Sequence, residues 1–243
     1  LIFSLARPRK GTVLSRVSTE GVAIEAVVDC SGSMKTEMDY YGEKLNRLEV
    51  VKRVLSDFIK GDKENFTGRE NDLVGLVSFA RYSDTKCPLV LGHGVLLEML
   101  KKTDIVRLES ENATAIGDAI ALGAARLKNV EQEIHQRKAR FGLEPNSPAG
   151  SGTNTYEIKS KIIILLTDGR NNAGEYIPLQ AAGLAKKWGI KIYTIGIGSA
   201  RSFHTVETPM GSFKLPTGQQ LNEGLLKRIA ADTGGFYRRV EHD

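Results

Sequence analysis

Four short, almost uninterrupted apolar runs constrain the fold of this chain more than any other feature. They are residues 22–29 (VAIEAVVD), 73–80 (LVGLVSFA), 161–167 (KIIILLT) and 190–198 (IKIYTIGIG). Runs of this length, rich in Val and Ile, predict strands that are buried on both faces, as in a parallel sheet. The segments between them are long enough to hold the crossover connections that parallel strands need.

Helical periodicity appears between these runs. Residues 45–59 place apolar side chains on one face, and residues 114–127 are rich in small side chains that allow close packing on a sheet. Further elements are expected as helices at residues 96–100, 178–188 and 221–231, and as strands at residues 86–91 and 236–240. Pro88 favours an edge position for its strand. We therefore predict an α/β fold: a Rossmann-like, doubly wound, mainly parallel sheet with one short antiparallel edge strand and helices on both faces.

The 243 residues suit one large domain with insertions. We expect an N-terminal arm at residues 1–20 and the domain itself at residues 21–243. Within the domain we expect a polar loop at 36–44, a polar insertion at about 130–160 with a mobile part at 145–155, and a hairpin-like insertion at about 203–220. The longest aliphatic run, residues 162–166, is far shorter than the about 20 residues of a membrane-spanning helix. Because the chain begins with Leu1 rather than Met, we expect it to be part of a longer protein.

The charge pattern excludes some classes of function. The formal net charge is +5, from 34 basic and 29 acidic residues, and the basic residues are scattered. Since no basic stripe is interleaved with aromatic residues, we expect no nucleic-acid binding. Two cysteines, Cys30 and Cys87, are too few for a disulfide-rich scaffold or a cysteine zinc cluster, and we expect both to be free thiols.

The end of the first apolar run carries the most specific chemical signal. Asp29, Ser31 and Ser33 follow one another at alternate positions in a small-residue turn. Alternate side chains of a tight turn can converge on one point, and oxygen donors of this kind suit a hard cation such as Mg²⁺. The alternative is structural, because Asp and Ser after a strand often cap the next helix.

Two further segments favour the metal site. Asp168 follows the apolar run 161–167, and Thr114 lies at the mouth of the small-residue helix, where it could also be a helix cap. In open α/β sheets, ligands bind beyond the carboxyl ends of strands where the strand order reverses. If the strands that end at Asp29 and before Asp168 flank that point, the two carboxylates face each other across it.

The pattern Asp29-x-Ser31-x-Ser33, followed by Thr114 and then Asp168, resembles the von Willebrand factor A (VWA) domain with its metal-ion-dependent adhesion site (MIDAS). The segments LVGLVSFA, TAIGDAIALGAARLK and KIIILLTDGRNNAG resemble bacterial Bat-type membrane proteins of aerotolerance operons. The likeness covers residues 20–240. This sequence differs from those proteins in two places: the stretch 130–160 is longer than expected, and the 36–44 loop carries Asp39, Tyr40 and Tyr41.

The resemblance implies a binding protein rather than an enzyme. Its cofactor would be a divalent cation, Mg²⁺ first, with Mn²⁺ and Ca²⁺ as alternatives, bound by Asp29, Ser31, Ser33, Thr114 and Asp168. Its partner would be a protein that supplies an Asp or Glu to the open coordination position. The resemblance also implies a parent protein anchored in the bacterial inner membrane, with this domain facing the periplasm, and a functional link to a MoxR-type AAA+ ATPase.

Two other functions compete with this one. A metal-dependent hydrolase or phosphatase could use the same oxygen cluster, but it would need a nucleophile or base at the metal, and none is evident. A metal-free interaction domain is the other, and the complete set of five donor residues argues against it. The chain also has no Gly-Lys dipeptide and hence no Walker A loop.

Overall fold

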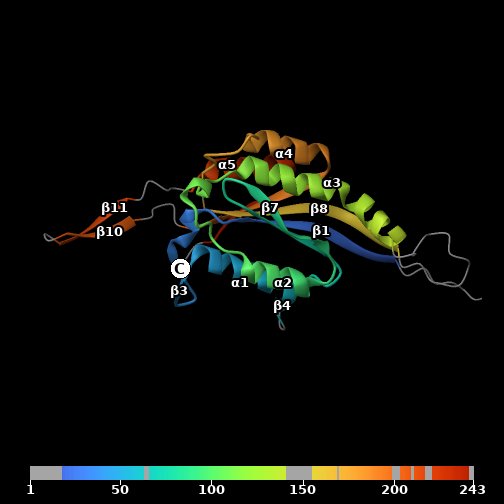
Figure 1. Cartoon of the computed structure of the whole chain (residues 1–243), viewed down its shortest axis with the longest axis horizontal. Helices are drawn as coiled ribbons and strands as arrows, with labels where there is room; N and C mark the ends of the chain where they lie inside the picture. Colours follow the sequence, from blue (N-terminus) through green and yellow to red (C-terminus); the bar gives the residue numbers. More distant parts are fainter. Residues whose placement is uncertain are drawn as a thin grey trace, which may run out of the picture.

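In the residues that the computed structural model describes, six strands form a central sheet with helices on both faces (Figure 1). The described residues are 18–62, 66–140, 155–168, 170–198, 203–208, 211–216 and 221–240. The strand order across the sheet is β12 (Tyr237–Val240), β9 (Ile190–Ile197), β8 (Thr155–Thr167), β1 (Ser18–Asp29), β6 (Leu73–Phe79) and β7 (Ser83–Val90). Neighbouring strands are parallel except β6 and β7, so β7, which contains Pro88, is an antiparallel edge strand. The predicted fold class is confirmed.

Strands β1 and β8 are neighbours, and the strands that follow them lie on opposite sides of the pair. After β1 the chain next enters this sheet at β6, whereas after β8 it continues to β9 and then to β12. This divergence is the switch point at which α/β sheets bind ligands. Asp29 is the last residue of β1 and Asp168 directly follows β8, so both acidic residues lie at this point, as predicted.

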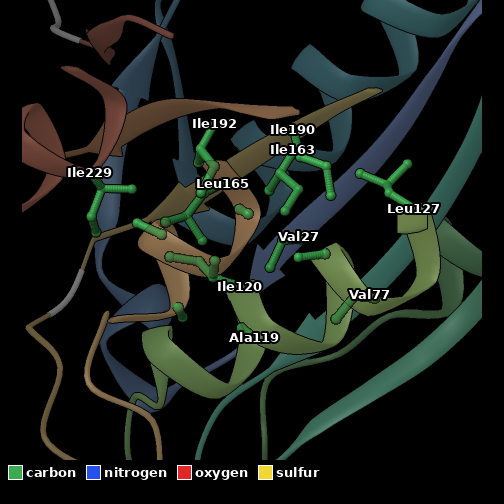
Figure 2. Close-up of a cluster of buried hydrophobic side chains, with 14 of the residues drawn as sticks. Val27, Val77, Ala119, Ile120, Leu127, Ile163, Leu165, Ile190, Ile192 and Ile229 are labelled. Atoms are coloured by element: carbon green, nitrogen blue, oxygen red, sulfur yellow. The ribbon is translucent and has the colours of Figure 1, made fainter. Parts of the chain in front are cut away.

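Helices α3 (Ile116–Arg140), α4 (Pro178–Lys187) and α5 (Glu223–Thr233) cover one face of the sheet, and α1 (Arg47–Lys60) and α2 (His93–Lys102) cover the other (Figure 1). Figure 2 shows the core under α3, where Val27, Ile163 and Leu165 from the central strands meet Ile120. A small residue brings α3 close to β1, because a Cβ at Gly123 would lie 3.3 Å from Cγ2 of Val27. The small-residue helix therefore packs on the sheet as its composition predicts.

Residues 36–44 are not a loop, so that prediction is wrong. Strand β2 (Glu37–Tyr40) pairs antiparallel with β3 (Glu43–Asn46). Tyr41 and Gly42 join the two strands with φ angles of 51° and 80°. These positive angles are those of a two-residue hairpin turn. The two strands are only four residues long and mostly polar, so apolar periodicity does not reveal them.

Both central strands extend beyond their apolar runs. β1 begins at Ser18 and β8 at Thr155, and these two residues are paired in parallel register. Their first residues are polar, which is why the apolar pattern begins only at Val22 and Lys161. Ser18–Glu20 is thus part of β1, within the segment expected as an N-terminal arm.

An asparagine side chain sets the start of α1. Oδ1 of Asn46 accepts a 2.8 Å hydrogen bond from the N–H of Glu49. This capping bond starts the helix at Arg47, two residues later than its apolar pattern suggests. Arg47 is therefore the first helical residue, and its side chain can reach the carboxyl ends of the strands.

The remaining described elements are short. They are the 3-10 turns η1 (Gly32–Lys35) and η2 (Glu109–Glu111), the paired strands β4 (Gly61–Asp62) and β5 (Phe66–Thr67), and the antiparallel pair β10 (Phe203–Thr208) and β11 (Gly211–Pro216). Residues 141–154, most of the segment expected to be mobile, lie outside the described residues. Cys30 and Cys87 are buried free thiols, in agreement with the sequence prediction.

Candidate metal centre

Asp29 and Asp168 occupy the carboxyl ends of two adjacent strands and are withdrawn from solvent. Asp29 is fully buried, and Asp168 is 3% exposed. Parallel pairing of β1 with β8 brings their ends to the same edge of the sheet. Buried carboxylates are retained only where hydrogen bonds or positive charges compensate them, so their partners define what the site can do.

A chain of hydrogen bonds joins the two carboxylates through the serines of the first loop. The N–H of Ser31 donates to Oδ1 of Asp29 at 2.9 Å, and the hydroxyls of Ser31 and Ser33 lie 3.0 Å apart. The Ser33 hydroxyl then donates to Oδ1 of Asp168 at 2.6 Å. Four of the five predicted site residues are therefore linked in one cluster. The alternation of the motif explains this, because η1 turns both serine side chains toward the same side.

Helix capping does not account for these residues. Ser31 stands at the N-cap position of η1, but its side chain makes no capping hydrogen bond. The first residue of α3 is Ile116, so Thr114 lies one residue before the N-cap position of that helix. Neither Ser31 nor Thr114 therefore makes the side-chain hydrogen bond that would define a helix cap.

Thr114 contacts the loop that follows Asp168 through its backbone rather than through its hydroxyl. Its N–H donates to Oδ1 of Asn172 at 2.7 Å, and its carbonyl accepts the N–H of Asn172 at 3.0 Å. The N–H of Gly117 donates to Oδ1 of Asn171 at 3.3 Å. Two asparagines that follow Asp168 therefore fasten their loop to the start of α3, and Thr114, 5% exposed, is held beside the loop of Asp168.

Asp118 makes a second fastening between α3 and the same loop. Its carboxylate accepts the N–H groups of Glu175 at 2.9 Å and Tyr176 at 2.8 Å. Gly174 approaches closely, with φ of 98°, and a Cβ there would lie 2.9 Å from Oδ1 of Asp118. Residues 171–176 are thus held at several points by Thr114 and the start of α3.

Two residues that contact the carboxylates were missed from the sequence. The Thr167 hydroxyl donates to Oδ2 of Asp29 at 2.6 Å, and Nη1 of Arg47 forms an ion pair with Oδ2 of Asp168. Thr167 lies next to Asp168 in the sequence, which could have drawn attention to it. Arg47 carries no such signal, since a basic residue at the start of an amphipathic helix usually faces solvent.

The two carboxylates differ in their electrostatic environment. Asp168 is paired with Arg47, whereas no described basic side chain forms an ion pair with Asp29. Burial, and then the negative charge of Asp168, raise the pKa of Asp29 to about 7, although the hydrogen bonds from Thr167 and Ser31 act in the opposite direction. A buried carboxylate held only by neutral donors is a position where a cation would be stabilised.

The donor set fits a small hard cation. In the described part of the chain, no group of three or more His, Cys, Asp or Glu side chains is placed to hold a metal ion. Any cation here would bind two carboxylates at most and would otherwise depend on the hydroxyls of Ser31, Ser33 and Thr114. Oxygen donors of this kind suit Mg²⁺ or Mn²⁺ rather than a thiolate-preferring metal.

The chain is similar to proteins of known sequence and to proteins of known structure. An uncharacterized protein of Borreliella burgdorferi is 28% identical over the whole of this chain, which spans 61% of that protein's length. The structure of the conserved hypothetical protein BatB from Bacteroides thetaiotaomicron is 26% identical, with a TM-score of 0.61 over 92% of each chain. An aerotolerance-related membrane protein from Bacteroides fragilis has the same fold, with 23% identity and a TM-score of 0.61 over 91% of this chain and 92% of its own. In the described residues of this chain, no helix has both the length and the apolar character to cross a bilayer.

The family of the chain follows from the extent of a sequence match. The pattern of the von Willebrand factor type A domain matches residues 24–242, from the middle of β1 to beyond the last described strand. The matched region includes all five predicted site residues and every described helix. This chain belongs to the von Willebrand factor type A domain family.

Proposed function

We propose that this domain binds a protein partner through a divalent cation at the β1–β8 switch point. Asp29, Ser31, Ser33, Thr114 and Asp168 would hold the cation, Mg²⁺ first, and an Asp or Glu of the partner would complete its coordination. The observation that carries this proposal is the hydrogen-bonded chain from Asp29 through Ser31 and Ser33 to Asp168. That chain gathers oxygen donors at the point where α/β sheets bind ligands.

The charges at the site favour an anionic ligand. Asp29 and Asp168 carry two negative charges, and Arg47 carries one positive charge. With a divalent cation added, the positive charges exceed the negative charges by one. A partner carboxylate would therefore meet a site of net positive charge, partly shielded from water.

Binding is better supported than hydrolysis. Both oxygens of Asp29 accept hydrogen bonds, from Ser31 and Thr167, and both oxygens of Asp168 are engaged by Ser33 and Arg47. A general base must be able to accept a proton from its substrate or a water molecule. If Asp29 and Asp168 bind the cation, as proposed, neither remains as a separate base beside it, so the hydrolase alternative would need a base that this group of contacts does not supply.

The cellular setting is proposed from the likeness to Bat-type proteins. We place the parent protein in the bacterial inner membrane, with this domain facing the periplasm, and link it functionally to a MoxR-type AAA+ ATPase. The support is the name of the Bacteroides fragilis neighbour, an aerotolerance-related membrane protein, and the greater length of the Borreliella relative. Domain limits at residues 21–243 are part of the same proposal.

A pull-down with three matched arms tests the function. Wild-type domain with Mg²⁺ should retain a protein partner, and both a chelator and the Asp29→Ala substitution should release it. A partner that stays bound in the chelator arm would contradict metal-dependent binding. Assaying the Mg²⁺-loaded domain with a generic phosphate ester checks the alternative, since turnover abolished by Asp29→Ala would favour a hydrolase.

A further inference from the structure

We propose that Arg47 is a positioning residue of this metal site: its guanidinium neutralises Asp168 and weakens the binding of the cation. The inference rests on the proposed metal-binding function and adds a residue that the motif does not contain. Its consequence is a site in which Asp29 is the main anchor of the cation, while Asp168 is shared between the cation and an internal positive charge.

The contacts of Arg47 lie within the site itself. Nη1 donates to Oδ2 of Asp168, and it also lies 3.5 Å from the carbonyl oxygen of Ser33. The Arg47 side chain is 6% exposed and that of Asp168 is fully buried. The ion pair is therefore buried. Charge interactions in the protein interior are much stronger than at the surface.

The structure leaves Arg47 little freedom to move away. Its N–H donates to the carbonyl of Thr36 at 3.1 Å, and the preceding Asn46 caps α1. At the end of β9, Gly198 adopts φ of 118°, and a Cβ there would lie 2.8 Å from Nη2 of Arg47. The guanidinium thus occupies space that a glycine leaves open, and it is held between the first loop, the Asp168 loop and β9.

Arg47 makes the two carboxylates unequal. Ser33 engages Oδ1 of Asp168 at 2.6 Å, and Arg47 engages Oδ2, so both oxygens have protein partners and one partner is charged. Asp29 is held by neutral donors, the N–H of Ser31 and the hydroxyl of Thr167. A cation would gain most from Asp29, because the negative charge of Asp168 is already compensated.

Two opposite effects follow from replacing Arg47 by an uncharged residue. Without metal, the Asp168 carboxylate would be buried without a positive partner, which destabilises the domain. With metal, the repulsion between the guanidinium and the cation is gone, and Asp168 is available to the cation. The variant should therefore fold less well than wild type without metal and bind metal more tightly.

The first test compares wild type with Arg47→Met, which keeps much of the side-chain length, and with Arg47→Lys, which keeps the charge. Arg53→Met is the matched control, because Arg53 lies on the same helix and is 48% exposed. We expect Arg47→Met to bind Mg²⁺ and Mn²⁺ about tenfold more tightly in calorimetry, about 1.4 kcal/mol. Its Tm should fall without metal and should rise on metal addition by more than that of wild type. Arg47→Lys should stay within about threefold of the wild-type affinity.

A second pair of variants keeps the test valid if Arg47→Met does not fold. Asp168→Asn removes the partner charge and leaves Arg47 facing the cation, whereas Arg47→Met with Asp168→Asn removes both charges. The double variant should bind Mg²⁺ about tenfold more tightly than Asp168→Asn alone, equivalent to about 1.4 kcal/mol. Equal affinities in this pair would overturn the role of Arg47.

The outcomes separate this inference from the function on which it rests. If wild type binds metal and Arg47→Met binds it no more tightly, Arg47 is only structural and the inference fails alone. An equal lowering of Tm with and without metal would also make Arg47 only structural. If wild type gives no heat with Mg²⁺ or Mn²⁺, the proposed function fails, and the inference fails with it.

Discussion

The hydroxyl of Thr167 donates a 2.6 Å hydrogen bond to Oδ2 of Asp29, so the last residue of β8 holds the carboxylate at the end of β1. Both residues are fully buried. The carboxylate proposed as the main metal anchor is thus oriented from the neighbouring strand.

Replacing Thr167 by Val should weaken the site while keeping the fold. Loss of the hydroxyl leaves Oδ2 of Asp29 without this partner, which should lower the free energy of unfolding by about 1–3 kcal/mol. Affinity for Mg²⁺ should fall about tenfold, as when a group that orients a ligand is removed. Thr194→Val is the control. Thr194 lies on β9, and its buried hydroxyl donates a 3.0 Å hydrogen bond to the carbonyl of Leu226, away from the site. Calorimetry should show lost affinity only in Thr167→Val, and an equal loss in both variants would contradict the role of Thr167.

The clustering of Asp29, Ser31, Ser33 and Asp168 could largely be predicted from the sequence, because one carboxylate ends an apolar strand and the other directly follows one. That these residues bind a cation stays a prediction. Arg47 was not predictable, because its role depends on the exact start of α1 and on a glycine at residue 198. The β2–β3 hairpin was missed because its strands are short and polar and show no apolar alternation. Only the turn residues Tyr41 and Gly42 mark it as a hairpin.

A buried glutamate away from the site should control how stability depends on pH. Glu25 is fully buried on β1, and burial raises its pKa to about 8, an effect that Arg126 reduces and Glu133 increases. The unfolded chain loses this proton near pH 4.5, whereas the folded chain keeps it until about pH 8. The folded state therefore binds more protons in this range, and its stability falls as the pH rises from about 4.5 to 8.

Glu25→Gln should remove this part of the pH dependence. The variant should resemble wild type near pH 5 and lose less stability by pH 8, measured as urea midpoints at a series of pH values. The comparison between variants is needed because the raised pKa of Asp29 acts in the same direction. Glu98→Gln, at a side chain that is 60% exposed, should follow wild type. Parallel curves for wild type and Glu25→Gln would show that Glu25 is ionised throughout the range.

The glycine at the start of α3 should be intolerant of a methyl group. A Cβ at Gly117 would lie 1.8 Å from the carbonyl oxygen of Tyr176, so Gly117→Ala must displace the loop that begins at Asp168. We expect a loss of about 1–3 kcal/mol in unfolding free energy, together with weaker Mg²⁺ binding. Gly183→Ala in α4 has nothing within 4 Å of the new methyl group and should stabilise by up to about 1 kcal/mol. Unchanged metal affinity in Gly117→Ala would mean that this loop does not position the site.

The two cysteines should be unreactive in the folded protein. Burial raises the pKa of Cys30 to about 12, and Cys87 is also buried, with its pKa raised for the same reason. Because the thiolate is the reactive form, iodoacetamide at pH 8 should modify neither thiol in native protein and both in urea. Intact mass should not change on reduction. A gain of two hydrogens would instead reveal a disulfide.

The proposed cation site depends most on Asp29, and calorimetric titration of Mg²⁺ and Mn²⁺ into wild type and Asp29→Ala tests it most directly. Wild type should bind one divalent cation. Asp29→Ala should bind it at least about 100-fold more weakly, because the variant lacks the carboxylate whose charge is not neutralised by a described basic side chain. Circular dichroism should show both proteins folded, and Asp232→Ala, at an exposed acidic residue on α5, should bind like wild type. If Asp29→Ala binds Mg²⁺ and Mn²⁺ as tightly as wild type does, no cation is held at the β1–β8 switch point and the account is wrong.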